Sequence, residues 1–387
     1  MISKGDIFSP KRTESGTVME RIGNNKDRYI ISLHDLSQLL CILSLAILGT
    51  NYLLYAFFQF AFNRNILRII AGCCLLISTL LGKRISIKEL LLIPVAFYMI
   101  VVNGVLSNNI AYIILAAIAI PYYADMVWKQ LNVIQLVFVA VVVFSIQTGI
   151  VNYHVITVGS RIRNTLGFTN FNAAGVFFFS LLVIWLLQLE EIRLVHIVIS
   201  AVISYGTYRL TNSRTAFACM IIFELSFLLL NKWNGRKTAV IFDAVLVVFF
   251  LSPLLVMLLR AFFPLLDRVV SFRLTRYSTF IAVNDVKTLL FGGCKLEGVD
   301  SFYLCLLYNG GIVFYIFTLL MGLTALYRYI TNGQCGYAAF IISIAAFGLM
   351  ESGVMRCELL CMVMFWYLLL RPLKKEERDR KYAQDAV

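Results

Sequence analysis

Apolar stretches of about 20 residues recur along the whole chain, and short polar segments separate them. A stretch of that length, coiled as an α-helix that rises 1.5 Å per residue, crosses the roughly 30 Å of hydrocarbon in a bilayer. The pattern therefore predicts an all-α, polytopic membrane protein with about twelve transmembrane helices. We place these helices at residues 36–57, 66–82, 88–106, 109–124, 131–151, 171–189, 194–210, 214–231, 238–259, 302–327, 336–351 and 357–371.

The polar segments divide the chain into one membrane domain and two tails. Residues 1–31 are polar and basic with no compact hydrophobic core, so we expect a cytoplasmic tail that leads into an uncleaved signal anchor. Residues 32–371 form the predicted transmembrane domain, and residues 372–387 form a basic cytoplasmic tail. The longest connection, at about residues 260–301, is the candidate catalytic loop, because long ordered loops are usually functional.

Composition agrees with this class of protein. Hydrophobic residues make up 60% of the 387 residues, charged residues make up only 14%, and the mean hydropathy is +0.83. Soluble domains carry roughly 25% charged residues. No polar stretch is long enough for a separate soluble domain.

The distribution of charge predicts the orientation in the membrane. Basic residues crowd both tails and the loops near residues 83–88, 129 and 232–237, which all lie on one side. By the positive-inside rule this side is cytoplasmic, so both termini are expected there. The net charge of +13 is then explained by orientation along an anionic inner leaflet, and no nucleic-acid partner is expected.

Arginine and lysine are distributed differently across the predicted membrane. Among the lysines only Lys287 and Lys295 lie on the external side. Many arginines lie at or beyond the external surface, namely Arg161, Arg163, Arg209, Arg214, Arg260, Arg268, Arg273, Arg276 and Arg356. The planar guanidinium binds phosphate and carboxylate with two parallel hydrogen bonds, so the external face is a candidate anion site. For any single arginine, snorkelling to lipid headgroups or pairing with an acid is an equally good interpretation.

One external segment has the features of a phosphate site. In the sequence TNSRTAF, Arg214 begins a predicted helix just after Asn212 and Ser213, which are residue types that cap helices. Free backbone N–H groups at the helix start and a guanidinium would then face the same spot.

The candidate catalytic loop and the residues after it add two arginines and an acid. Arg273 and Arg276 are three residues apart, so a helix would point both the same way. Asp300 stands at the external mouth of the tenth predicted helix, where a carboxylate beside arginines is a candidate general base. A helix cap or an ordinary ion pair is at least as common a role for such a carboxylate.

Four motifs occur in order between about residues 160 and 315. They are RNTLGFTNFNAAG (163–175), NSRTAF (212–217), SFRL (271–274) before LLFGG (289–293), and DSFYLCLLYNGGIVF (300–314). Together they resemble the O-antigen ligase and Wzy-type polysaccharide polymerase superfamily over about residues 160–315. Two positions depart from the family pattern. Phe272 replaces the usual glycine of the loop motif, and Asp300 stands where the ligases carry histidine, which favours a polymerase.

The resemblance implies a GT-C-like helical membrane glycosyltransferase in a bacterial plasma (inner) membrane. The donor would be a glycan on undecaprenyl pyrophosphate, and the acceptor would be a sugar hydroxyl of another lipid-linked repeat unit. The product would be O-antigen, capsule or exopolysaccharide. A flippase and a chain-length regulator are the protein partners that the resemblance implies.

The residues at the external face match what such a reaction needs. There is no Asp-x-Asp motif or acid cluster, so guanidinium groups would stabilise the leaving pyrophosphate in place of a metal, and no cofactor is expected. The candidate residues are Arg163, Arg214 and Arg273 as the pyrophosphate clamp, Arg161 and Arg276 beside them, Asp300 as the general base, and Asn170, Asn172 and Tyr303 as residues that position sugars.

Two other functions stay open on this sequence. A flippase for lipid-linked oligosaccharides also has about twelve helices and cationic cavities. Such a transporter is expected to have its charges near the bilayer midplane and to consist of two similar halves. In this chain the external cations lie at one surface, and the two halves do not look alike. A ligase that transfers the finished glycan to another acceptor is distinguished only by the residue at position 300.

Overall fold

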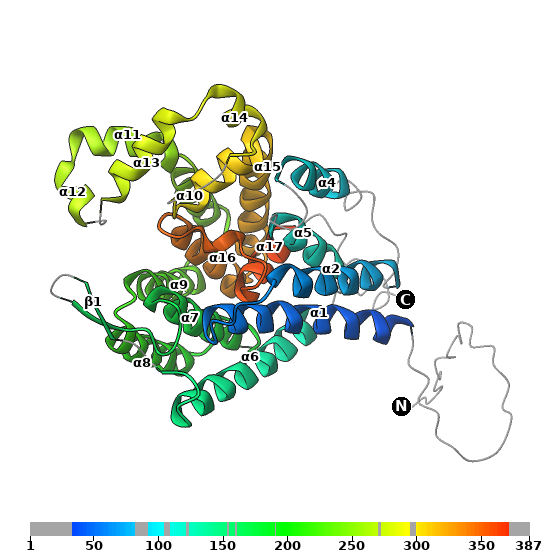
Figure 1. The fold of residues 1–387 in the computed structure, drawn as a ribbon. Helices are drawn as coiled ribbons and strands as arrows, with labels where there is room; N and C mark the ends of the chain where they lie inside the picture. Colours follow the sequence, from blue (N-terminus) through cyan, green and yellow to red (C-terminus); the bar gives the residue numbers. More distant parts are fainter. Residues whose placement is uncertain are drawn as a thin grey trace, which may run out of the picture. The chain divides into compact units, whose positions relative to one another are not determined.

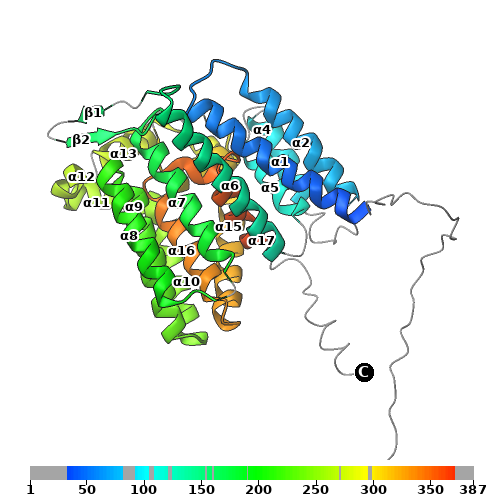
Figure 2. The same cartoon turned by 90° about the horizontal axis from the view of Figure 1, so that it is seen from below.

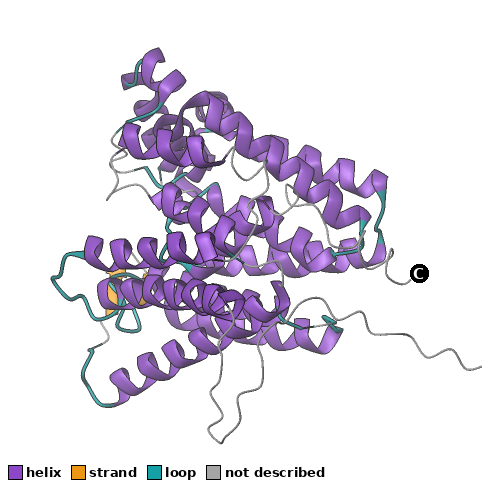
Figure 3. Ribbon diagram, turned by 90° about the vertical axis from the view of Figure 1, so that its right-hand side faces the viewer, coloured by secondary structure: helices purple, strands orange, loops and turns teal. Residues whose placement is uncertain are grey.

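The computed structural model describes residues 33–81, 92–103, 109–120, 124–152, 155–158, 161–189, 191–269, 272–294 and 299–370. This part of the chain is mostly helical (Figure 3). Six of its helices are long and apolar enough to cross a membrane, so the chain is a multi-pass helical membrane protein. They are α1 (Leu33–Ala56), α2 (Arg64–Leu81), α6 (Ala124–Gln147), α8 (Leu194–Thr211), α9 (Arg214–Lys232) and α15 (Phe302–Thr331).

Shorter helices occupy the other predicted positions. They are α4 (Leu92–Asn103), α5 (Asn109–Ala119), α7 (Phe171–Leu187), α10 (Arg236–Phe250), α16 (Cys335–Gly348) and α17 (Leu360–Leu370). A helix therefore lies at each of the twelve predicted positions. The number of crossings stays a prediction, because these six helices are shorter than a full span.

The ninth predicted helix is not continuous. α10 ends at Phe250, and α11 (Ser252–Phe262) continues at an angle of 56° to it. Pro253 stands in the first turn of α11, where proline is favoured because its missing N–H is not needed. The span predicted over 238–259 is therefore a bent pair of helices in the structure.

A small antiparallel hairpin interrupts the otherwise helical structure. Strands β1 (Val155–Val158) and β2 (Arg161–Asn164) pair so that Ile156 lies opposite Arg163. The prediction of a purely α-helical chain missed this hairpin, which carries two of the candidate arginines.

The core of the bundle is formed by the last three long apolar segments. Every residue of α17 is buried, as is almost every residue of α16. α9 packs along α16, α10 packs along α15, and α1 packs along α2 (Figures 1 and 2). The C-terminal helices therefore occupy the centre, and the second-half helices that carry the candidate motifs pack directly on them.

Buried hydroxyl and amide groups join neighbouring helices. The Ser44 hydroxyl donates to the Ala71 carbonyl at 2.8 Å between α1 and α2, and the Ser343 hydroxyl donates to the Cys219 carbonyl at 2.6 Å between α16 and α9. Such interhelical hydrogen bonds are typical of membrane helix packing, where hydrophobic burial alone does not discriminate between helix and lipid.

The predicted catalytic loop is itself helical. After α11 it contains α12 (Pro264–Val269), α13 (Arg273–Val283) and α14 (Val286–Phe291). α14 abuts α15 at a kink where Gly311 has φ 75°, and a Cβ there would lie 2.5 Å from the Leu290 carbonyl oxygen. Only glycine fits this approach. The contact fixes the loop against the first turns of α15, just after Asp300.

Candidate functional site

Arg273 is the first residue of α13, and the local backbone fixes it there. Phe272, directly before it, adopts a left-handed conformation with φ 60° and ψ 25°. The Asp267 carboxylate accepts hydrogen bonds from the Thr275 backbone N–H at 3.2 Å and from the Thr275 hydroxyl at 2.5 Å. Phe272 thus adopts a conformation that glycine adopts without strain and that other residues adopt at a cost.

The Arg273 guanidinium joins three separate chain segments. One terminal nitrogen donates to the Met350 carbonyl, and the other lies 3.6 Å from a Glu351 carboxylate oxygen and 3.9 Å from an Asp300 carboxylate oxygen. The Arg273 and Glu351 side chains are 17% and 16% exposed, whereas the Asp300 side chain is 49% exposed. Of the two carboxylates, Asp300 is therefore the more accessible one.

Glu351 extends this cluster to α7 and α9. The Asn172 amide donates to the same Glu351 oxygen at 3.1 Å, and the Asn172 carbonyl oxygen lies 3.4 Å from the Ser213 hydroxyl. Asn172 is in the first turn of α7, and Ser213 immediately precedes α9. The motifs that contain Asn172, Ser213, Arg273 and Asp300 thus meet around one buried carboxylate.

Two local features hold the start of α7 in this place. Asn170 is the N-cap of α7, and its side-chain oxygen accepts from the Ala173 N–H at 2.8 Å. Gly175 lies against α9 so closely that a Cβ would be 2.4 Å from the Ser213 hydroxyl oxygen. The glycine after FNAA therefore permits the approach of α7 and α9 that brings Asn172 to Ser213.

Burial raises the pKa of Glu351 to about 7, although the positive charge of Arg273 acts in the opposite direction. The negative charge of Asp300 adds to the rise, and Arg356 opposes it. Glu351 lies beyond the last residue of α16, in the connection to the 3₁₀ turn at Ser352–Met355. Near neutral pH this carboxyl therefore exists in both protonation states, a property that perturbed groups at functional sites often have.

The other candidate arginines have different surroundings. Arg163 in β2 places its guanidinium 4.0 Å from the centre of the Phe171 ring, next to Asn172. Arg214 follows Ser213 and is exposed, and Arg276 is exposed on α13. Neither the Arg214 nor the Arg276 side chain forms a hydrogen bond or ion pair with any residue that the structure describes. The side chain of Arg161 lies outside the described part.

Two details of the predicted site differ in the structure. Ser213 occupies the N-cap position of α9, but its side chain makes no capping hydrogen bond, and Asn212 instead ends α8 in a left-handed conformation with φ 53°. Arg273 and Arg276 do not act together, because Arg273 turns into the cluster while Arg276 remains exposed.

Tyr303 packs between α15 and α16 in this structure, which does not favour the predicted role of positioning sugars. Its side chain is fully buried, and its hydroxyl donates to the Ala345 carbonyl at 2.8 Å. Residue 303 lies on the face of α15 that packs on α16, where no sugar has access.

No known family model, curated protein or solved structure matches this chain. The case for its function therefore rests on the residues and their arrangement. Among the described residues there is no group of three or more histidine, cysteine, aspartate or glutamate side chains placed to hold a metal ion.

Glu351 and Glu358 were expected from the sequence only as possible ion-pair partners of the external arginines, and neither was given a role in the site. Glu358 pairs with Arg68 of α2, with 2.8 Å between the Arg68 Nε and the carboxylate, and both side chains are buried. The segment between α16 and α17 therefore carries two acids, each paired with an arginine distant in sequence. The available signal was the presence of Glu351, Arg356 and Glu358 in an otherwise apolar region, because charges in such regions are usually functional.

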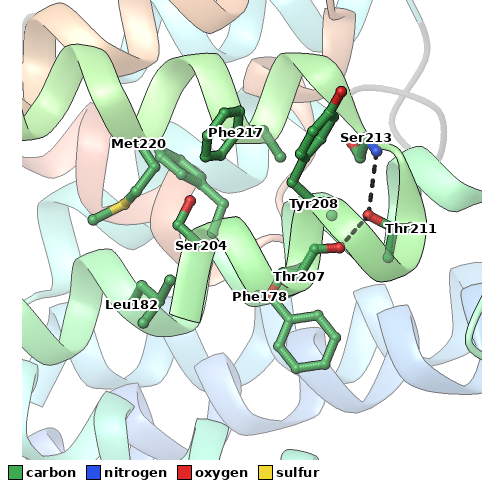
Figure 4. A pocket seen from close by; sticks show the side chains of 12 residues that line it. Phe178, Leu182, Ser204, Thr207, Tyr208, Thr211, Ser213, Phe217 and Met220 are labelled. Atoms are coloured by element: carbon green, nitrogen blue, oxygen red, sulfur yellow. Dashed lines mark hydrogen bonds between the residues drawn. The ribbon is translucent and has the colours of Figure 1, made fainter. Parts of the chain in front are cut away.

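A small cavity lies next to Ser213, between α7, α8 and α9 (Figure 4). Its wall includes the hydrogen-bonded pair Thr211 and Ser213, in which the Ser213 N–H donates to the Thr211 hydroxyl at 3.2 Å. The cavity volume is about 10 Å³, which is room for about one water molecule. It is too small to hold a sugar.

Proposed function

We propose that this protein polymerises undecaprenyl-pyrophosphate-linked oligosaccharide repeat units into a surface polysaccharide. The observation that carries the proposal is the meeting of four sequence segments around Glu351 and Arg273, with Asp300 exposed at the rim. Three of these segments belong to the motifs that resemble the polymerase superfamily. The fourth, which carries Glu351, is the connection between α16 and α17.

The proposed topology has twelve crossings with both termini in the cytoplasm of a bacterial cell and the cluster on the external side of its plasma membrane. A helix at each of the twelve predicted positions supports the count, and the basic tails and loops support the orientation. The proposed architecture is a GT-C-like helical membrane glycosyltransferase. In this orientation α13 and the start of α15 face the side where lipid-linked units are joined.

The proposed chemistry is a direct, inverting glycosyl transfer. The acceptor hydroxyl oxygen attacks the anomeric carbon of the donor glycan, the bond from that carbon to the pyrophosphate oxygen breaks, and undecaprenyl pyrophosphate leaves. Asp300 takes the proton of the attacking hydroxyl, because its carboxylate is the exposed one. Arg273, with Arg163 and Arg214 nearby, stabilises the negative charge that develops on the leaving group, and no metal is required.

Glu351 has a positioning role in this proposal. It holds the guanidinium of Arg273 and the amide of Asn172 without reaching the solvent-exposed rim itself. A fixed arginine is valuable because preorganised cations need no rearrangement when charge develops in the transition state.

A defined reaction with purified components tests the proposal. The full-length protein in detergent receives lipid-pyrophosphate repeat units, with chelator present and without ATP. We expect a ladder of products that grow by one repeat unit at a time. Absence of a ladder with and without added divalent metals would contradict the polymerase proposal and favour a flippase. Transfer only to a different acceptor would favour a ligase.

A further inference from the structure

Tyr277 lies one helical turn after Arg273 on α13 and has an unusual environment. Its side chain is 4% exposed, and its hydroxyl oxygen is buried without a hydrogen-bond partner among the described residues. An unsatisfied buried hydroxyl lowers the stability of a protein by about 1–3 kcal/mol. Natural structures therefore contain few of them, and each calls for an explanation.

Other buried tyrosines of this protein are satisfied by the backbone. The Tyr52, Tyr303 and Tyr329 hydroxyls donate to the carbonyls of Ala173, Ala345 and Leu368 at 2.8–3.0 Å. Tyr277 is the only tyrosine in the described part whose buried hydroxyl lacks such a bond. Several buried phenols of the described part thus have a backbone partner, whereas the enclosed Tyr277 hydroxyl oxygen has none.

Tyr277 follows Arg273 by four residues on α13, so the two side chains lie on the same face of that helix. The charges of Arg273, Asp300 and Glu351 all act on the phenol. Burial is the largest influence and raises the pKa of Tyr277 above its usual value, so the hydroxyl stays neutral and is a hydrogen-bond donor. A donor in this position suits an anionic oxygen and does not suit a cation.

The contact between Arg273 and Asp300 shows how such an oxygen gains access. At 3.9 Å it is too long for a hydrogen bond, and the Asp300 side chain is half-exposed. An anion that replaces Asp300 beside Arg273 would arrive one turn away from the Tyr277 hydroxyl. The displaced Asp300 carboxylate is then free to face the acceptor.

We propose that the Tyr277 hydroxyl and the Arg273 guanidinium bind the same substrate oxyanion, an oxygen of the leaving pyrophosphate. The identity of the anion rests on the polymerase function proposed above. The hydrogen bond that the resting protein lacks is completed only when this oxygen is present. Tyr277 is thereby a substrate-binding residue that the sequence motifs do not mark.

The test compares Tyr277→Phe with Tyr329→Phe in the full-length, detergent-purified protein. Both tyrosines are 4% exposed, and each substitution removes one hydroxyl, but only the Tyr329 hydroxyl has a backbone partner. The measurements are the melting temperature without ligand and the affinity for inorganic pyrophosphate by calorimetry. The ladder reaction is run in parallel.

We expect Tyr277→Phe to melt at or above the wild-type temperature and to bind pyrophosphate about tenfold more weakly, as for one hydrogen bond to a charged group. Tyr329→Phe should melt lower and bind pyrophosphate as the wild type does. Wild-type affinity in Tyr277→Phe, a loss of melting temperature equal to that of Tyr329→Phe, or no binding by the wild type would each overturn the inference. A wild type that binds pyrophosphate through Tyr277 but makes no ladder would refute the polymerase and leave this anion site standing.

Discussion

Glutamine at position 351 should remove a pH dependence of stability that the wild-type carboxyl produces. In the folded protein the pKa of Glu351 rises from 4.5 to about 7, chiefly because of burial. A carboxyl with a raised pKa keeps its proton to higher pH in the folded protein than in the unfolded chain. Its contribution to stability is therefore fully present below about pH 4.5 and is lost as the pH rises through about 7.

The size of this effect follows from the change in pKa. The rise from 4.5 to about 7, at about 1.36 kcal/mol for each pKa unit, corresponds to about 3 kcal/mol in the free energy of unfolding. The side chain is only 16% exposed, so solvent screening is limited. Arg273 and Asn172 contact the Glu351 carboxylate, and the charges of Asp300 and Arg356 also act on it.

The assay is the melting temperature of the purified protein in detergent at pH 5 and pH 8. Glu351→Gln keeps an oxygen that accepts from Asn172 and Arg273 but cannot ionise. We expect it to exceed the wild type by several degrees at pH 8 and by much less at pH 5. Glu191→Gln is the control, because Glu191 is 75% exposed and pairs with Arg193 at the surface. Equal differences between Glu351→Gln and the wild type at both pH values would refute this explanation of the cluster.

Three further changes test other parts of the account. Arg273→Lys keeps the charge but loses the planar fork that reaches Met350, Glu351 and Asp300. The amount of polymer, normalised to the amount of protein in the membrane, should therefore fall by about 10²–10³-fold. Full activity of this variant would argue against the proposed role of Arg273. For the topology, Lys287→Cys and Asn234→Cys are made in a cysteine-free background and treated on intact cells with an impermeant thiol reagent. The reagent should label the exposed position 287 but not position 234. The opposite pattern would show that the proposed orientation is inverted. At the left-handed Phe272, Phe272→Gly should be at least as stable as the wild type, whereas Phe272→Val should lose on the order of 1–2 kcal/mol in the free energy of unfolding. Equal melting temperatures of the two variants would show that the backbone at this position is not strained.

The helical part of the fold was predictable because hydropathy is a strong signal over about 20 residues. The start of α9 at Arg214 was correctly predicted, since the polar TNS sequence ends one apolar stretch and begins the next. The hairpin at 155–164 was not predictable in the same way, because four-residue strands carry little periodic signal. The break between α10 and α11 had a visible cause in Pro253, which hydropathy alone does not register.

The candidate site was predictable only in its motifs and not in its contacts. Arg273, Asp300 and Asn172 were singled out by residue type and motif, and the structure brings them together. Glu351 was given no role in the site because its partners lie 78 and 179 residues away, a distance that no local pattern encodes. Tyr303 was assigned to sugars from its motif, whereas the burial of its side chain depends on the packing of α15 against α16, which the motif does not reveal. Tyr277 could not be singled out from the sequence either, because only the packed structure reveals a buried hydroxyl without a hydrogen-bond partner.

The most direct test of the central claim is the rate of a single glycosyl transfer by Asp300→Asn. The asparagine keeps the size of the side chain but cannot accept the proton of the attacking hydroxyl. One lipid-pyrophosphate donor and one labelled lipid-linked acceptor are mixed with excess enzyme, and the joined product is followed in time. We predict a rate about 10²–10⁴-fold below that of the wild type, with pyrophosphate affinity retained. Transfer by Asp300→Asn at the wild-type rate would contradict the claim that the exposed carboxylate beside Arg273 carries out the chemistry.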